Sequence, residues 1–206
     1  MRQCGDCTLC CKLLPMVDGK DPAHKQKVRE AVEKMVEFGI APAAYFANMV
    51  EEVAKPAGVP CPFQRFHKGC TVYARRPFGC RTWNCRWLVE EAGETGRPDR
   101  VHYVIDIVPD VVRIDHEDGP VDIEVIQVWC DPKHPDSHRD PALRAYLLAR
   151  AEEGKAALIR YSAYDGFVLA APPFTESDEW EEQRSNMKAF TRKGIDPNPD
   201  NWTPRP

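Results

Sequence analysis

The sequence predicts an α+β protein, in which a cysteine-rich half made of helices and loops is followed by a small antiparallel sheet with one or two helices. Apolar residues recur at helical spacing before residue 56, whereas they alternate with polar residues in many segments after residue 100. Of the nine cysteines, eight lie within the first 85 residues. We therefore expect a metal-binding region over residues 1–92 and an α+β region over residues 93–206, packed together as one unit.

Two helices are expected in the first half. Asp21 precedes Pro22, the pattern of an N-cap followed by proline at the first helical position. Apolar residues follow at helical spacing up to Gly39, namely Val28, Val32, Met35 and Val36. A second helix is expected from Pro42, ending before Pro56 and Gly58, with an apolar face of Tyr45, Phe46, Met49, Val50 and Val53.

Strands are expected after a polar break at residues 91–99. Segments 101–108, 111–115 and 121–129 are rich in β-branched residues, and Asp118-Gly119 is typical of a hairpin turn. Segments 158–162 and 166–170 predict a further hairpin, after a helix over residues 141–153. We also expect a final helix over residues 177–190 and a proline-rich surface tail over residues 196–206.

Composition excludes several classes of protein. The chain of 206 residues carries a formal net charge of −4, which does not favour a nucleic-acid or anionic-membrane partner. No apolar run approaches the roughly 20 residues of a membrane span. The chain starts Met1-Arg2-Gln3-Cys4, where a secretory signal would need an apolar stretch. We therefore expect a soluble, cytoplasmic protein with no membrane partner.

The clustered cysteines indicate metal binding or redox chemistry. In an exported protein their density would indicate disulfides, but the expected cytoplasmic location and the odd count disfavour a fully paired set. Cys4, Cys7 and Cys10 follow the spacing Cys-x2-Cys-x2-Cys, which can wrap a tetrahedral ion or one corner of an iron–sulfur cluster. Adjacent Cys10 and Cys11 rarely serve the same ion, so one of them can belong to a second site, bridge, or pack as a small apolar residue.

A second block holds four more cysteines, Cys61, Cys70, Cys80 and Cys85. Eight thiolates can form two four-thiolate sites, or one site and an auxiliary redox group, and the spacing leaves both open. His67 is a possible ligand in a mixed site, although an exposed histidine is the simpler interpretation. Cys130 stands apart and is expected at the end of a core strand.

Charge in the second block matches an anionic metal site. Residues 61–87 contain six Lys or Arg residues and no Asp or Glu. A four-thiolate site carries a net charge of about −2 with zinc or with an oxidised four-iron cluster, which guanidinium groups would stabilise. We expect Arg76 and Arg81 to do this beside the ligands. The alternative is a solvated basic face.

These motifs resemble a known family. Cys4-x2-Cys7-x2-Cys10-Cys11, then Cys61-Pro62, then Cys70-x2-Tyr73-x2-Arg76-Pro77-x2-Cys80-Arg81, is similar to the CxxCxxCC, or YkgJ-like, cysteine-cluster family. The resemblance covers roughly residues 4–87 and implies chelation of zinc or iron by the cysteines. Flagellin lysine N-methylases carry a similar cysteine pattern, which keeps an iron–sulfur cluster among the alternatives.

Three functions are open at this point. The first is a metal-binding protein whose centre, a 4Fe-4S cluster or zinc, is redox-active or structural. The second is a metal-dependent enzyme acting on a protein or small molecule, for which a pocket lined from both halves would be the distinguishing feature. The third, a nucleic-acid binder that stacks bases on the aromatic residues of the basic block, is disfavoured by the acidic chain.

Overall fold

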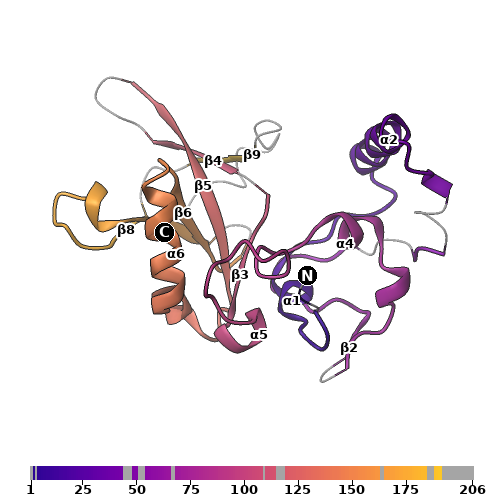
Figure 1. Cartoon of the computed structure of the whole chain (residues 1–206), viewed down its shortest axis with the longest axis horizontal. Coiled ribbons are helices and arrows are strands. Elements are labelled where there is room, and N and C mark those ends of the chain that lie inside the picture. Colours follow the sequence, from indigo (N-terminus) through magenta and orange to yellow (C-terminus); the bar gives the residue numbers. More distant parts are fainter. Residues whose placement is uncertain are drawn as a thin grey trace.

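The computed structural model describes residue 2 and residues 4–43, 48–50, 54–65, 68–108, 110–114, 119–162, 165–184 and 188–191. Figure 1 shows the N-terminal part, including α4, on one side and a twisted sheet on the other, with β3 on the side of the sheet that faces α1. Both helices and sheets are present, so the α+β class is confirmed. The division at residues 92 and 93 stays a prediction.

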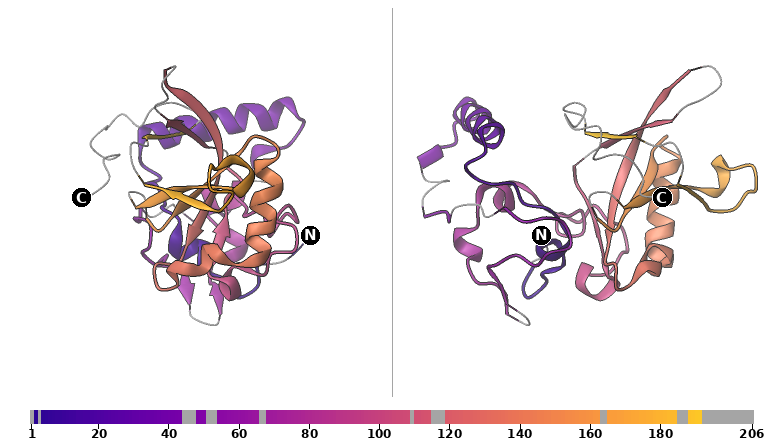
Figure 2. Two further views of the ribbon diagram at one scale, coloured as in Figure 1. Left: turned by 90° about the vertical axis from the view of Figure 1, so that its left-hand side faces the viewer. Right: turned by 180° about the vertical axis from the view of Figure 1, so that it is seen from behind.

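The N-terminal part consists of short elements joined by loops. Its helices are α1 (Leu9–Leu13), α2 (Pro22–Glu37), the 3-10 turn η1 (Tyr73–Arg75) and α4 (Phe78–Thr82), and its strands are β1 (Gln64–Arg65) and β2 (Gly69–Cys70). Helix α2 begins as expected, with the Asp21 carboxylate accepting hydrogen bonds from the amides of Ala23 (2.7 Å) and His24 (3.1 Å). None of its side chains is fully buried, and Figures 1 and 2 show it far from the sheet.

The second expected helix is only partly described. Pro42 and Ala43 are helical, whereas Asn48 turns the chain with φ +60° and Met49 and Val50 are not helical. The prediction is therefore wrong at these two apolar residues. Its remaining residues, 44–47 and 51–53, lie outside the described part of the chain.

The sheet is built around the ten-residue strand β5 (Val121–Cys130). Among the described residues it has seven strands in the order β8-β7-β6-β5-β4-β9, with β3 also pairing with β5. The further strands are β3 (Tyr103–Ile105), β4 (Asp110–Ile114), β6 (Ala156–Arg160), β7 (Gly166–Ala170), β8 (Glu181–Gln183) and β9 (Lys188–Thr191). The 158–162/166–170 hairpin and the 111–115/121–129 pairing are confirmed, although Asp118 of the predicted turn lies outside the described residues.

Three expectations for the second half are corrected. The first expected strand, 101–108, is shorter, because Pro98 starts helix α5 (Pro98–Val101) before β3 begins. The sheet is mixed, since β5 and β6 pair in parallel through a crossover containing the 3-10 turn η2 (Pro135–Arg139) and helix α6 (Pro141–Ala151). The expected helix over 177–190 is wrong, because its ends form β8 and β9, which pair with β7 and β4.

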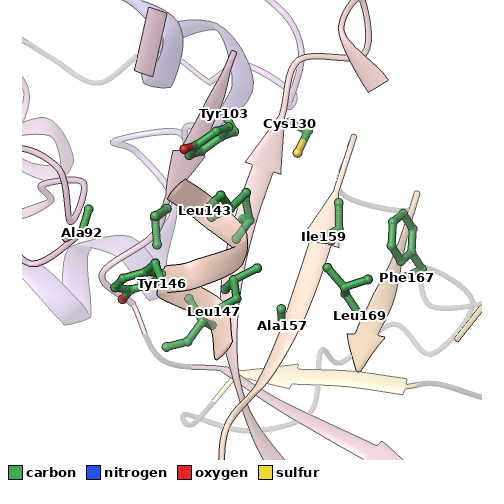
Figure 3. Close-up of a cluster of buried hydrophobic side chains, with 13 residues drawn as sticks. Ala92, Tyr103, Cys130, Leu143, Tyr146, Leu147, Ala157, Ile159, Phe167 and Leu169 are labelled. Atoms are coloured by element: carbon green, nitrogen blue, oxygen red, sulfur yellow. The ribbon is translucent and has the colours of Figure 1, made fainter. Parts of the chain in front are cut away.

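Helix α6 and the sheet enclose the main core. Leu143 and Leu147 of α6 pack with Tyr103, Ile159 and Phe167 from three strands, as Figure 3 shows. Cys130 is completely buried in the same cluster, which agrees with its expected place at a strand end. After β7 the chain makes one more 3-10 turn, η3 (Pro172–Phe174). The sheet is thus a packed platform on which the N-terminal part rests.

A second, smaller core joins the two parts. Leu9 and Leu13 of α1 and Leu88 are buried against Val104 of β3 and Trp129 of β5. Lys12 of α1 also forms an ion pair with Asp131 just beyond β5, with 2.5 Å between Nζ and Oδ2. These contacts fix the first cysteine loop against one edge of the platform.

Candidate metal centre

Eight of the nine cysteines line a single cavity of about 810 Å³ between the N-terminal part and the sheet. They come from the first loop, from α1, from the β1–β2 hairpin region and from α4 and the turn after it. These cysteines are Cys4, Cys7, Cys10, Cys11, Cys61, Cys70, Cys80 and Cys85. All eight are free thiols in the structure. The two cysteine blocks of the sequence therefore meet in space.

The first block is held by local turns and a short helix. The Cys7 amide donates to the Cys4 carbonyl at 2.9 Å, which curls the loop around the first two thiols. Cys10 and Cys11 are consecutive residues of α1, so their side chains leave the helix about 100° apart. Because Leu9 and Leu13 of the same helix are buried, its orientation is fixed by packing.

The second block is tied to the first through the backbone. The Cys61 amide donates to the Cys11 carbonyl at 3.0 Å. In the β1–β2 hairpin, Cys70 pairs with Gln64, and the neighbouring Gly69 lies against the first loop. A Cβ atom at Gly69 would stand 2.6 Å from the Gly5 carbonyl oxygen, and its φ of +75° also favours glycine. This close approach requires glycine beside Cys70.

Cys85 connects the cysteines to the sheet. It follows α4 and forms an isolated antiparallel bridge with Asp106, the residue after β3. Trp83, two residues before it, donates from Nε1 to the Asp106 carboxylate at 2.7 Å, and Arg86 donates from Nε to the Asp106 carbonyl at 3.0 Å. Asp106 therefore positions the last cysteine of the second block.

Burial holds most of these thiols in the protonated form. It raises the pKa of Cys4, Cys70 and Cys85, and that of Cys7 to about 11. Cys10 and Cys11 are hydrogen-bonded to each other, which raises the pKa of Cys10 and lowers that of Cys11. A metal cation bound here would have to displace these protons, as in thiolate metal sites generally.

Two cations offset the negative charge of ionised thiols. The charge of Arg76, expected from the sequence, contributes to the lowered pKa of Cys11 and partly offsets the effect of burial on the pKa of Cys4 and Cys70. The second, Lys55, also lowers the pKa of Cys11. It is only 6% exposed, and its Nζ donates to the carbonyls of Lys12 and Leu14. Sequence analysis missed Lys55, because it precedes the basic block and nothing in its local pattern marks it.

Arg81 has a different part in the site. Its Nε donates to the Arg76 carbonyl at 3.2 Å and its Nη2 to the Ala74 carbonyl at 2.9 Å. It thereby braces the turn that carries Arg76 toward the thiols. The other proposed ligand, His67, lies outside the described residues.

The thiols surround the cavity without meeting at one point. Across the described ranges, no three His, Cys, Asp or Glu side chains come together in a way that could hold a metal ion. The cysteine thiols thus line a cavity that is larger than a single metal ion.

The sheet half supplies further residues of the cavity lining. Asp106, Asp110, Gln127, Trp129 and Arg160 all line it, and each is at most 8% exposed. Asp110 and Arg160 form a buried ion pair, with 3.2 Å between Oδ2 and Nη2. The pocket is therefore lined from both halves of the chain, by thiols and by buried polar and charged side chains.

A ring of free thiols drawn from two sequence blocks defines a metal-chelating protein. In agreement, residues 3–99 match the model of the CxxCxxCC family, described as "Putative zinc- or iron-chelating domain". This match confirms the resemblance drawn from the cysteine spacing. No curated protein and no solved structure was found to match the chain. None of the helices in the described ranges has the length and apolar character needed to cross a bilayer.

In the metal-free, reduced protein, we expect iodoacetamide to modify Cys11 before Cys7 or Cys10, because the lowered pKa of Cys11 leaves more of it as thiolate near neutral pH. Lys55→Met should slow this reaction several-fold by raising the pKa of Cys11. The difference in rate between the wild type and Lys55→Met should disappear at a pH above the pKa of Cys11 in both proteins. Mass spectrometry of timed samples measures the rates.

The matched control is Lys68→Met, because Lys68 belongs to the same basic block and its side chain is exposed. If both variants slow Cys11 equally, or neither does, Lys55 does not act on this thiol through its charge.

Proposed function

We propose that this protein binds an iron–sulfur centre through the thiolates of its eight clustered cysteines and that the centre transfers electrons. The observation that supports this most directly is that all eight cysteines line one cavity. Metal chelation itself agrees with the family of residues 3–99. The identity of the metal is the further step proposed here.

The donor set fits a cluster. Thiolates are the usual ligands of iron–sulfur clusters, whereas a single zinc ion needs four donors at about 2.0–2.3 Å from one point. The thiols here lie around a wider space, which suits a group several atoms across such as a 4Fe-4S cluster. Arg76 and Lys55 would offset the negative charge of the loaded site.

Two centres of four thiolates each account best for the arrangement. Cys4, Cys7 and Cys10 pack with Cys85 around the small core that joins α1 to the sheet. The charges of Cys11 and Cys61 act on Cys70, and those of Cys61, Cys11, Cys10 and Cys80 act on Lys55, which lies beside this second group. We therefore assign Cys4, Cys7, Cys10 and Cys85 to one centre, and Cys11, Cys61, Cys70 and Cys80 to the other. Adjacent Cys10 and Cys11 then serve different centres.

A reducing compartment is part of the proposal. All nine cysteines are free, and thiols at this density stay reduced in the cytoplasm. We infer a cytoplasmic location on this ground.

Catalysis is the second candidate function. The cavity is lined by thiols and by buried polar side chains of the sheet, as expected for a metal centre that acts on a bound molecule. This pocket favours a metal-dependent enzyme over a purely structural zinc site, which would be closed by its ligands.

Protein purified without oxygen should be brown, with visible charge-transfer absorption and with iron and acid-labile sulfide in equal amounts. Absorption spectroscopy with analysis of iron, zinc and sulfide measures this. A colourless protein with stoichiometric zinc would contradict the iron–sulfur centre and indicate a structural zinc site instead. Absence of both metals from freshly purified protein would contradict metal binding by these thiols. Cys130→Ala is the control and should keep its full metal content, since Cys130 lies in the main core.

The assignment of four cysteines to each centre predicts the metal content of single and double cysteine variants. Cys85→Ala and Cys80→Ala should each lower the metal content by about half, because each removes a ligand from one of two centres. The double variant Cys80→Ala/Cys85→Ala should lose nearly all metal, whereas Cys4→Ala/Cys85→Ala should still keep about half. Complete loss of metal in either single variant would show that the eight cysteines share one centre.

A further inference from the structure

An ion-pair network of three residues joins the first cysteine loop to helix α5. Arg97 donates from Nε and Nη2 to the two carboxylate oxygens of Asp99, at 2.6 and 2.7 Å. Its Nη1 lies 2.8 Å from the carboxylate of Asp6, which stands between Cys4 and Cys7 in the sequence. The three charged residues lie outside the lining of the cavity. The network therefore contacts the cysteine loop from outside the space that the thiols enclose.

The geometry of Arg97 is more defined than that of an ordinary surface ion pair. A single exposed pair contributes little, whereas a bidentate pair between arginine and a carboxylate fixes the plane of the guanidinium. The backbone of Arg97 is also held, because its carbonyl accepts from the amides of Arg100 (2.9 Å) and Val101 (3.2 Å) at the start of α5. Only 23% of the Arg97 side chain is exposed. Arg97 thus offers its remaining nitrogen, Nη1, to Asp6 from a fixed position.

Cys7 is the thiol that this network positions. Hydrogen bonds from the amides of Leu9 and Asp99 to its sulfur partly offset the effect of burial on the pKa of Cys7. The first of these bonds is local, whereas the second needs the loop to stay against α5. Asp6 precedes Cys7 directly, and its ion pair with Arg97 holds the loop there.

An amide that donates to a ligand sulfur affects the metal centre. Such hydrogen bonds orient the ligand and stabilise negative charge on it. Because reduction adds a negative charge to an iron–sulfur cluster, they favour the reduced form and raise the reduction potential. The contact between Asp99 and Cys7 is of this kind.

We propose that Arg97 is a positioning residue of the metal centre, which holds Cys7 at the Asp99 amide through Asp6 and so strengthens metal binding and raises the reduction potential. The inference rests on the proposed function, because it takes Cys7 as a ligand of a redox-active centre. Without Arg97, the carboxylates of Asp6 and Asp99 would lose the guanidinium that balances their charge. Their negative charge would disfavour the reduced centre, so this effect and the weakened hydrogen bond lower the potential together.

Release of metal to a chelator tests the positioning of Cys7. Arg97→Gln should lose the metal of one of the two proposed centres at least about 10-fold faster than the wild type, since changes to residues that orient ligands typically cost roughly 10- to 100-fold in affinity. The centre that contains Cys80 should lose its metal at the wild-type rate. Arg97→Lys keeps the charge but not the fork, so it should also lose metal faster, and it replaces Arg97→Gln if that variant does not fold.

The matched control is Arg113→Gln. Arg113 makes the same kind of fork to Asp122 on the sheet, with 2.7 Å from Nε to Oδ1 and 2.9 Å from Nη2 to Oδ2. This pair lies on the exposed surface of β4 and β5, so its loss should change neither the release of metal nor the potential.

The reduction potential is the readout that a change in fold stability alone would not move. Redox titration followed by visible absorption should give a more negative potential for the centre that contains Cys7 in Arg97→Gln, and an unchanged potential in Arg113→Gln. Unchanged release or an unchanged potential in Arg97→Gln, or equal changes in the control, would overturn the proposal. Wild-type protein that binds zinc or no metal would instead contradict the proposed iron–sulfur centre.

Discussion

Eight thiols around one cavity are the constraint on which the N-terminal part depends. Partial or full burial raises the pKa of several of them, including Cys7 and Cys85, so the polypeptide alone favours their neutral form. The elements around them offer little packing of their own, since α1 has five residues, β1 and β2 have two each, and α2 buries no side chain completely. Metal binding to thiolates contributes on the order of 10 kcal/mol to the stability of small domains, which is comparable to the entire free energy of unfolding of a typical protein. On the proposed function, a bound metal would therefore both act as the functional group of this part and stabilise its fold.

The sheet half has the opposite character, and the two halves meet at a few well-defined contacts. Its core of α6 against β5, β6 and β7 is complete without the cysteines. Asp106 links the halves, because it bridges Cys85 through the backbone and accepts from Trp83 through its carboxylate. Asp106 therefore couples the position of Cys85 to the end of β3. This arrangement joins a metal-dependent part and a rigid platform around one cavity.

Much of this organisation could be predicted from the sequence, for identifiable physical reasons. Helix α2 has a proline and an aspartate cap at its start, and β5 has a long run of β-branched residues, so local signals suffice. The convergence of Cys4 and Cys85 followed from the chemistry that clustered thiols share. Strands β8 and β9 could not be predicted, because edge strands form through pairing with β7 and β4 rather than through their own composition. Lys55 and Asp106 were missed for the same reason, since only the fold brings them to the cysteines.

X-ray absorption at the edge of the bound metal tests the central claim most directly, because it measures which atoms surround the metal in the protein as purified. The account predicts a first shell of sulfur alone, at about 2.3 Å, with a second shell of iron if the centre is a cluster. A first shell dominated by nitrogen or oxygen would contradict the account, because it would place the metal away from the eight cysteines.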